Sequence, residues 1–325
     1  LRGYVVTELT DLEWEGNGWL DYWRQPKGFH AELAAANAPL ALIARPQRRG
    51  VWAGQPLVVG LQVANDTDRA LEGVVRWSLD GAAGGELPAA APARTSAALP
   101  DAVRLSAPAL GHAALRLELV VGGGVAARTS AELFLADPAE ATVAATRLGG
   151  VGLERLLRQR LERFGFRMRG PWRDAPAVVA AQLDRALLAY AEAGGRVLYL
   201  AGGTGGGAEL AGLSLFPLPP GESWRMAAGA AWARPDRLPP LTAELGWEAE
   251  AIFPQRVIDA ASLGPDDEVL AGWLEGWLAN AGALALARPL GRGRLLATTF
   301  RFDDAYGVEP AATLLLNRLI RLLLD

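Results

Sequence analysis

Apolar residues alternate with polar or small residues along the stretch 57–63, where Leu57, Val59, Leu61 and Val63 occupy every second position. An alternation of this kind predicts a β-strand with one buried face. Further strands are expected at residues 71–79, 98–105, 113–121 and 125–135, separated by turn sequences and by a loop rich in Gly, Ala and Pro. Short strands with turn signals at this spacing predict an immunoglobulin-like β-sandwich.

Two features of this region have alternative interpretations. Asn65, Asp66 and Thr67 match a glycosylation sequence, but the same residue types favour tight turns, and we interpret them as a turn. Trp52 and Trp77 are either platforms on which a sugar stacks or core residues. A tryptophan within an alternating strand favours the core.

After Asp137 the pattern changes to strands that alternate with amphipathic helices. Strands are expected at 141–146, 177–180, 196–200, 269–270, 283–287 and 294–300, and helices at 153–164, at 183–193 and from Pro310 onward. A βαβ series with right-handed crossovers predicts a mostly parallel sheet with helices on both faces, and hence a flavodoxin-like α/β domain.

The N-terminal residues predict one strand, one loop and one helix. An apolar run from Tyr4 to Val6 leads into a polar, aromatic-rich loop, and a helical stretch covers residues 29–37. This is the repeating unit of a (β/α) barrel, in which binding groups lie at the C-terminal end of a strand. Residues 39–56 are rich in Pro and Gly and are expected to be a linker. The predicted domains are therefore 1–38, 39–137 and 138–325.

Composition excludes several classes of function. The net charge of −4 gives no electrostatic case for nucleic-acid binding. No stretch reaches the roughly 18 apolar residues of a membrane span. The chain has no cysteine and only two histidines, His30 and His112, which are far apart, so we expect no disulfide, metal site or cofactor. A cytoplasmic location is favoured, and any targeting signal is expected to lie upstream of Leu1.

Three short motifs resemble the last strand and helix of the catalytic barrel in glycoside hydrolase family 2, the β-galactosidase, β-glucuronidase and β-mannosidase superfamily. The motifs are Thr7-Glu8-Leu9-Thr10-Asp11, Gly18-Trp19-Leu20-Asp21 and Arg24-Gln25-Pro26-Lys27. Thr7 departs from the family pattern, which often has tryptophan there. β-Glucuronidases place an Asn-x-Lys clamp just upstream of Arg-Gln-Pro-Lys, where this chain has Glu15-Gly16-Asn17, so a glucuronide substrate is disfavoured.

The resemblance implies the C-terminal part of a retaining hydrolase of β-linked glycosides, β-galactosidase-like, with both catalytic glutamates upstream of Leu1. No catalytic residue is then expected in this chain, which alone would be inactive. The implied substrate-binding residues are Thr7, Glu8, Asp11, Trp14 and Asn17. Glu8 would bind sugar hydroxyls or form a structural salt bridge, and Asp11 would contact sugar or cap a turn. Trp14 would stack on a pyranose between Glu13 and Glu15, unless these are ordinary solvent-facing loop residues.

Residues 194–200 and 291–299 resemble class I glutamine amidotransferase-like domains that are appended to some β-galactosidases. Because an active amidotransferase needs cysteine and histidine, and residues 138–325 contain neither, this domain is expected to be catalytically silent and to serve packing or homo-oligomerisation. Gly202–Gly207 suggests a phosphate-binding loop, but the run has no lysine and leads into prolines rather than into a long helix. The alternative to a hydrolase fragment is a noncatalytic carbohydrate-binding or oligomerisation module.

Overall fold

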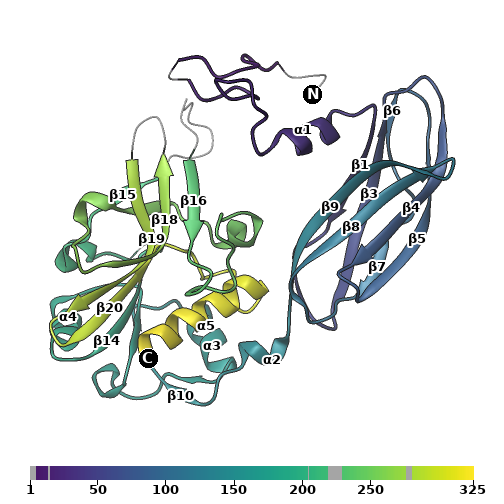
Figure 1. Ribbon diagram of the computed structural model, residues 1–325. Coiled ribbons are helices and arrows are strands. Elements are labelled where there is room, and N and C mark those ends of the chain that lie inside the picture. Colours follow the sequence, from purple (N-terminus) through teal and green to yellow (C-terminus); the bar gives the residue numbers. More distant parts are fainter. Residues whose placement is uncertain (1–4, 14, 204, 219–228, 276–279) are drawn as a thin grey trace. The chain divides into compact units, whose positions relative to one another are not determined.

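The computed structural model describes residues 5–13, 15–203, 205–218, 229–275 and 280–325. The chain divides into two compact units. The first unit comprises residues 1–48, 56–106 and 113–133, and the second comprises residues 49–55, 107–112 and 134–325. The colours of Figure 1 follow the chain from one unit to the other.

The first unit contains two antiparallel layers of strands (Figure 1). One layer contains β1 (Leu40–Pro46), β3 (Pro56–Asn65), β6 (Thr95–Ala98) and β7 (Val103–Ser106). The other contains β4 (Leu71–Leu79), β5 (Ala83–Ala91), β8 (Gly111–Val121) and β9 (Gly124–Ala136). The predicted period of two is confirmed, because Leu57, Val59, Leu61 and Val63 are all buried. Every second residue from Ala113 to Leu119 is buried in the same way.

Three predictions for this unit are wrong. The expected linker 39–56 contains β1, which pairs with β3 along its whole length because Ala41 and Leu42 are buried and Pro46 stands only at its end. The expected Gly/Ala/Pro-rich loop contains β5, which pairs with β4 throughout. In that strand a Cβ on Gly85 would lie 3.1 Å from the indole of Trp77, so the small residue makes room for the ring. The strand expected at 98–105 is instead two strands, β6 and β7.

Asn65 forms a turn, as predicted. It is fully buried, and its Nδ2 donates to the carbonyl oxygens of Arg69 at 2.9 Å, Ala91 at 3.2 Å and Pro92 at 3.0 Å. Its Oδ1 accepts from the backbone N–H of Thr67 at 3.1 Å. A side-chain amide held in this way is closed off from solvent. The match of residues 65–67 to a glycosylation sequence is therefore explained by the turn that these residues form.

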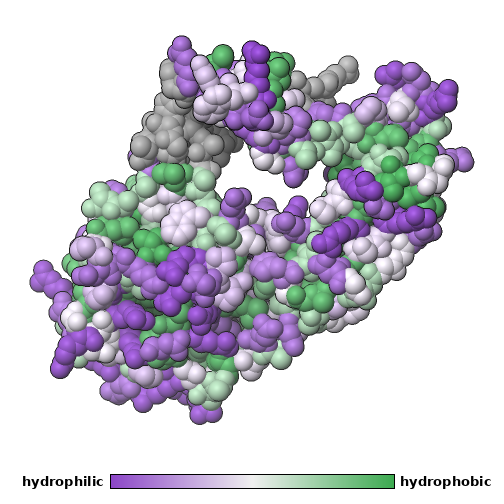
Figure 2. All heavy atoms as spheres, in the orientation of Figure 1, coloured by the Kyte–Doolittle hydropathy of each residue, from purple (hydrophilic) through white to green (hydrophobic). Residues whose placement is uncertain are grey.

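The N-terminal segment agrees with only part of its prediction. The helix is confirmed as α1 (His30–Ala36), although it buries no residue. Tyr4 lies outside the described residues, and Val5 and Val6 belong to no strand and are 91% and 39% exposed. A barrel strand needs neighbouring strands for its backbone hydrogen bonds, and the described chain supplies none here. Figure 2 shows hydrophobic residues among hydrophilic ones on the visible face of this segment.

The second unit is built on a mixed nine-stranded sheet. Its parallel part contains β11 (Gly149–Val151), β13 (Val178–Ala180), β14 (Arg196–Leu200) and β20 (Gly293–Thr298). Its antiparallel part contains β19 (Asn280–Leu290), β17 (Arg256–Asp259), β15 (Leu215–Pro217), β18 (Glu268–Glu275) and β16 (Gly229–Ala233). Smaller pairs are β10 (Thr146–Arg147) with β12 (Phe166–Arg167), and β2 (Gly50–Trp52) with the end of β9. The sheet is thus less parallel than predicted, because the two-residue turn at Gly291 and Arg292 joins β19 to β20 and forces them to run antiparallel.

Helices cover both faces of this sheet, as predicted. They are α2 (Pro138–Ala141), α3 (Arg155–Arg163), α4 (Arg185–Glu192) and α5 (Pro310–Leu324), with short 3₁₀ helices at Trp172–Asp174, Ala208–Ala211, Trp247–Ile252 and Ala260–Ser262. Leu187 of α4 shares a core with Val197 and Tyr199, whereas Leu315 of α5 shares a core with Leu198. Alternate residues of β14 therefore face opposite helices. The strand expected at 141–146 is wrong, since α2 ends at Ala141 and β10 begins at Thr146.

A buried polar chain joins α5 to α2. The Tyr306 hydroxyl donates to Asn317 Oδ1 at 2.8 Å, and Asn317 Nδ2 donates to the Ala141 carbonyl at 2.7 Å. Asn317 is 1% exposed and Tyr306 is fully buried, and burial raises the pKa of Tyr306. Each of these hydrogen bonds gives a partner to buried polar groups that water cannot reach. Among the helices described, none is both long and apolar enough to cross a bilayer.

Candidate functional site

The candidate site is the acidic loop, residues 7–13 and 15–27, which is organised around Asp11. One carboxylate oxygen of Asp11, Oδ1, accepts from the Gly18 backbone N–H at 2.9 Å and from Lys27 Nζ at 2.6 Å. Lys27 Nζ also donates to the Gly16 carbonyl at 2.7 Å. The Lys27 and Asp11 side chains are 21% and 17% exposed, so the ion pair is largely shielded from water. Asp11 and Lys27 therefore hold three stretches of the loop together.

Backbone contacts complete the loop. Thr10 bridges Leu20, and Leu20 bridges Pro26, so three segments of chain lie side by side. A Cβ on Gly18 would lie 2.3 Å from the carbonyl carbon of Thr10, a separation that no real Cβ contact has. Only glycine fits this position, because the neighbouring backbone leaves no room for a side chain.

Glu8 and Glu15 bring a second pair of acidic groups into the loop. A hydrogen bond with the Glu15 side chain, then desolvation, then repulsion by Glu15 and Asp11 raise the pKa of Glu8 above its usual 4.5. Among the residues that the structure describes, the buried Oε2 of Glu8 has no hydrogen-bond partner. The Glu8 carboxyl is thus held beside like charges, which favours its protonated form.

The predicted substrate-binding residues have different surroundings. Glu8 and Asp11 are half-buried and belong to the same acidic group. Thr7 and Asn17 are exposed, and Trp14 lies outside the described residues. Of the two alternatives for Asp11, the structural one accounts for its observed bonds, since Oδ1 serves the loop backbone and Lys27.

Sequence reasoning missed an aromatic pair in the same loop. Tyr22 and Trp23 have ring centroids 5.8 Å apart at an interplanar angle of 80°, and they are 60% and 77% exposed. Two large rings this open to solvent are available to a ligand. In the sequence, this pair is marked only by two aromatic residues standing next to each other within a polar loop. The pattern of hydrophobic periodicity does not detect such a pair. Within the described part of the chain, no group of three or more His, Asp or Glu residues is arranged to hold a metal ion.

The C-terminal ends of the parallel strands are where ligands bind in open α/β sheets, and a glycine-rich run follows β14 there. A Cβ on Gly205 would lie 1.7 Å from the Ala181 carbonyl oxygen, and one on Gly207 would lie 2.2 Å from the Leu183 carbonyl oxygen. These glycines are explained by close packing against carbonyl oxygens, which are groups that repel a phosphate. Nearby, burial and the Asp304 charge raise the pKa of Asp303, while Arg301 opposes the shift.

Comparisons with known proteins add little to this description. No sequence profile of a protein family matches the chain, and no curated protein sequence matches it. Among solved structures, the sporulation control protein Spo0M from Bacillus subtilis has a TM-score of 0.24 at 8% identity, covering 32% of this chain and 51% of Spo0M.

Two carbohydrate-active enzymes also overlap with part of the chain. A cycloisomaltooligosaccharide glucanotransferase from Paenibacillus has a TM-score of 0.25 at 11% identity, covering 42% of this chain and 19% of the enzyme. A β-glucuronidase of glycoside hydrolase family 2 has a TM-score of 0.25 at 11% identity, covering 49% of this chain and 20% of the enzyme. The chain thus spans about half the length of Spo0M and about a fifth of each enzyme. Overlaps this limited carry no argument about family or function.

Proposed function

We propose that this chain is the C-terminal part of a retaining hydrolase of β-linked glycosides, similar to the β-galactosidases of glycoside hydrolase family 2. Residues 1–38 supply the last strand and helix of the catalytic barrel, and residues 39–137 form an immunoglobulin-like sandwich. Residues 138–325 form an amidotransferase-like domain that has no catalytic role. The two catalytic glutamates lie on barrel strands outside this chain.

The acidic loop is the observation that carries the proposal. It combines carboxyl groups, from Glu8 and Glu15, with the exposed rings of Tyr22 and Trp23. Carboxylates accept hydrogen bonds from sugar hydroxyls, and aromatic faces pack against the apolar face of a pyranose ring. A loop with both features has the chemistry of a sugar subsite.

Exposed apolar side chains of the N-terminal segment give further support. Val5, Leu9, Leu12 and Phe29 are 91%, 68%, 57% and 47% exposed, and α1 buries nothing. An apolar surface of this kind calls for a covering structure, because its exposure to water is unfavourable. The remaining strands and helices of a barrel are such a structure, and they would give Val5 and Val6 the neighbours that a strand requires.

Each residue of the loop has a distinct role in this proposal. Glu8 accepts hydrogen bonds from substrate hydroxyls and is neither nucleophile nor acid/base. Asp11 acts through the loop backbone, as its bonds to Gly18 and Lys27 indicate. Thr7 and Asn17 are exposed and free to line the subsite, and Trp14 is proposed as a further stacking surface.

The test compares the 325-residue chain with a longer polypeptide that includes the preceding coding region. The chain alone should release no chromophore from aryl β-galactosides, β-mannosides or β-glucuronides. The longer polypeptide should hydrolyse a β-galactoside, and Glu8→Gln should lower kcat/KM by about one to two orders of magnitude without abolishing turnover. Azide should not rescue that variant, because azide replaces a missing nucleophile.

Two results would overturn the proposal. One is turnover by the 325-residue chain that disappears in Glu8→Gln. The other is a preceding region without two glutamates at the ends of barrel strands. Full activity of Glu8→Gln in an otherwise active enzyme would restrict Glu8 to a structural role.

A noncatalytic carbohydrate-binding module is the second candidate, and one cavity of the second unit favours it. This cavity of about 240 Å³ is lined by Trp52 and Phe164 together with the polar side chains of Gln55 and Arg163. Pockets of this composition, mostly apolar with a few polar groups, are typical of small-molecule sites. Calorimetry with β-linked oligosaccharides should then show binding without hydrolysis, weakened by Arg163→Ala. Equal binding by that variant would exclude this cavity as the site.

A further inference from the structure

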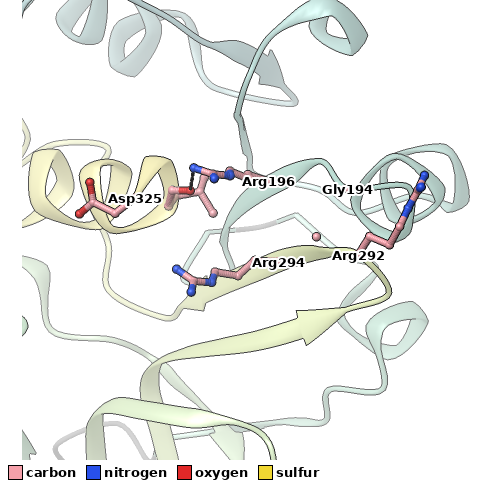
Figure 3. A pocket seen from close by; sticks show the side chains of 7 residues that line it. Gly194, Arg196, Arg292, Arg294 and Asp325 are labelled. Atoms are coloured by element: carbon pink, nitrogen blue, oxygen red, sulfur yellow. Dashed lines mark hydrogen bonds between the residues drawn. The ribbon is translucent and has the colours of Figure 1, made fainter.

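A cationic cavity lies at the N-terminal ends of the neighbouring strands β14 and β20. Its volume is about 260 Å³. It is lined by Gly194, Arg196, Arg292, Gly293, Arg294, Leu323 and Asp325, and we call it the arginine pocket. Figure 3 shows it between these strands and the end of α5.

Strand register brings two of the arginines together. Arg196 and Arg294 are direct partners on adjacent parallel strands, so their side chains leave the sheet on the same side. In Figure 3 both guanidinium groups point toward the end of α5, whereas Arg292 lies near Gly194 and points away from them. Like charges at directly paired positions repel each other, so this arrangement needs a compensating negative group.

The end of α5 supplies part of that compensation. Arg196 Nη1 donates to the carbonyl oxygens of Leu323, at 3.2 Å, and of Leu324. Arg294 Nη1 donates to the Leu322 carbonyl at 3.0 Å. The last carbonyls of a helix have no partner within the helix and carry about half a negative charge in total. That charge balances less than one of the two guanidinium groups.

The remaining donors have no acidic partner. Each bond above uses a single nitrogen of a guanidinium that has five N–H groups. Among the described residues, no carboxylate forms an ion pair with Arg196, Arg292 or Arg294. Elsewhere in the same unit Arg234, Arg237 and Arg288 each pair with an acid. In the 325-residue chain, three arginines and the two carboxylates of Asp325, one on its side chain and one at the chain end, leave the lining with a formal charge of 3 − 2 = +1.

We propose that the arginine pocket binds a phosphate group, either as inorganic phosphate or as part of a small phosphorylated sugar. A guanidinium matches the oxygens of a phosphate with paired, charge-assisted hydrogen bonds. Arg196 and Arg294 approach from two strands and offer several such donors, and the cavity has room for a group attached to the phosphate. The site lies at the opposite edge of the sheet from the glycine-rich run, and it does not depend on the proposed hydrolase function.

The experiment is calorimetric titration of the 325-residue chain with inorganic phosphate and, separately, with glucose 6-phosphate at low ionic strength. Arg294→Gln should weaken binding at least about tenfold, because it removes charge-assisted hydrogen bonds. Arg292→Gln should weaken it less, by about threefold, since its side chain points away. Asp325→Asn should tighten binding by about threefold, because it removes one of the two opposing carboxylates.

A matched control is Arg155→Gln, which removes an exposed arginine of α3 that does not line the pocket. It should bind both ligands like the wild type. Because Arg294 also caps α5, circular dichroism checks that its variant is folded, and Asp325→Asn provides a test that leaves every arginine in place. Tighter binding of glucose 6-phosphate identifies a phosphorylated sugar as the ligand, and equal affinities identify free phosphate. Absence of binding by the wild type, or equal effects of Arg155→Gln and Arg294→Gln, would overturn the proposal.

Discussion

The ion pair between Arg288 and Asp267 should be a principal stabilising contact of the second unit. Arg288 donates from Nε to Asp267 Oδ1 at 2.8 Å and from Nη2 to Oδ2 at 2.5 Å. The two side chains are only 13% and 3% exposed. Arg288 also donates to the carbonyls of Ala211 at 2.7 Å and Ser262 at 2.8 Å, so it joins β19 to two separate 3₁₀ helices, Ala208–Ala211 and Ala260–Ser262.

The perturbation is Asp267→Ala, which leaves the guanidinium shielded from water without its carboxylate. Removing one partner of a buried pair costs about 3–5 kcal/mol of unfolding free energy. A domain of about 150–250 residues loses about 2–4 °C in Tm per kcal/mol, so Tm should fall by about 6–20 °C. Differential scanning calorimetry measures this shift. The neighbouring Asp266→Ala is the control, because that exposed side chain should change stability by less than about 0.5 kcal/mol.

The same pair predicts a pH dependence. Burial raises the pKa of Asp267. The hydrogen bonds from Arg288 and from the Gly264 N–H lower this pKa, and so does the positive charge of Arg288. Together they outweigh burial and hold the pKa below 3.8. The native protein therefore releases this proton more readily than the unfolded chain. The stabilisation is complete above the unfolded pKa and is lost as pH falls through the lower folded value. The Tm difference between wild type and Asp267→Ala should therefore shrink below about pH 4. A shift under about 2 °C, or one that stays constant down to pH 2, would refute the reasoning.

Three further predictions concern other parts of the chain. Asn317→Leu should lower the unfolding free energy by about 2–4 kcal/mol in denaturant titrations, because it leaves the buried Tyr306 hydroxyl and the buried Ala141 carbonyl without partners. An unchanged denaturation midpoint would contradict this stabilising role of Asn317. Gly205→Ala should lower Tm because its Cβ would lie 1.7 Å from a carbonyl oxygen, while Gly206→Ala, with nothing within 4 Å, should not. Glu15→Gln should lower the pKa of Glu8, because the substitution removes the acidic neighbour that raises this pKa. A carboxyl-carbon NMR titration measures the change, and a Glu8 pKa that stayed raised would show that desolvation dominates.

Periodicity predicted those elements whose burial follows the local pattern. The strands at 71–79 and 196–200 were predicted with their observed bounds, and α1, α4 and α5 were predicted within a few residues. The alternation at Leu57 to Val63 could be read directly, because a half-buried strand must present every second residue to the core. Where composition and pairing conflict, as in β1 and β5, the sequence was misleading. Proline and glycine suggested loops, but a neighbouring strand of matching length stabilised extended backbone.

The candidate site was predictable only in part. The sequence by itself indicated Glu8 and Asp11 as notable carboxylates, excluded thiol chemistry through the absence of cysteine, and predicted an α/β unit after Asp137. Tertiary structure alone decided that Lys27 pairs with Asp11, and that Glu15 lies against Glu8. It also decided that Arg196 and Arg294 meet across two strands separated by nearly a hundred residues. Local sequence patterns show which side of a helix or strand is buried. Charge pairs and pockets depend instead on the register and folding of distant segments, and no short stretch of sequence specifies that register.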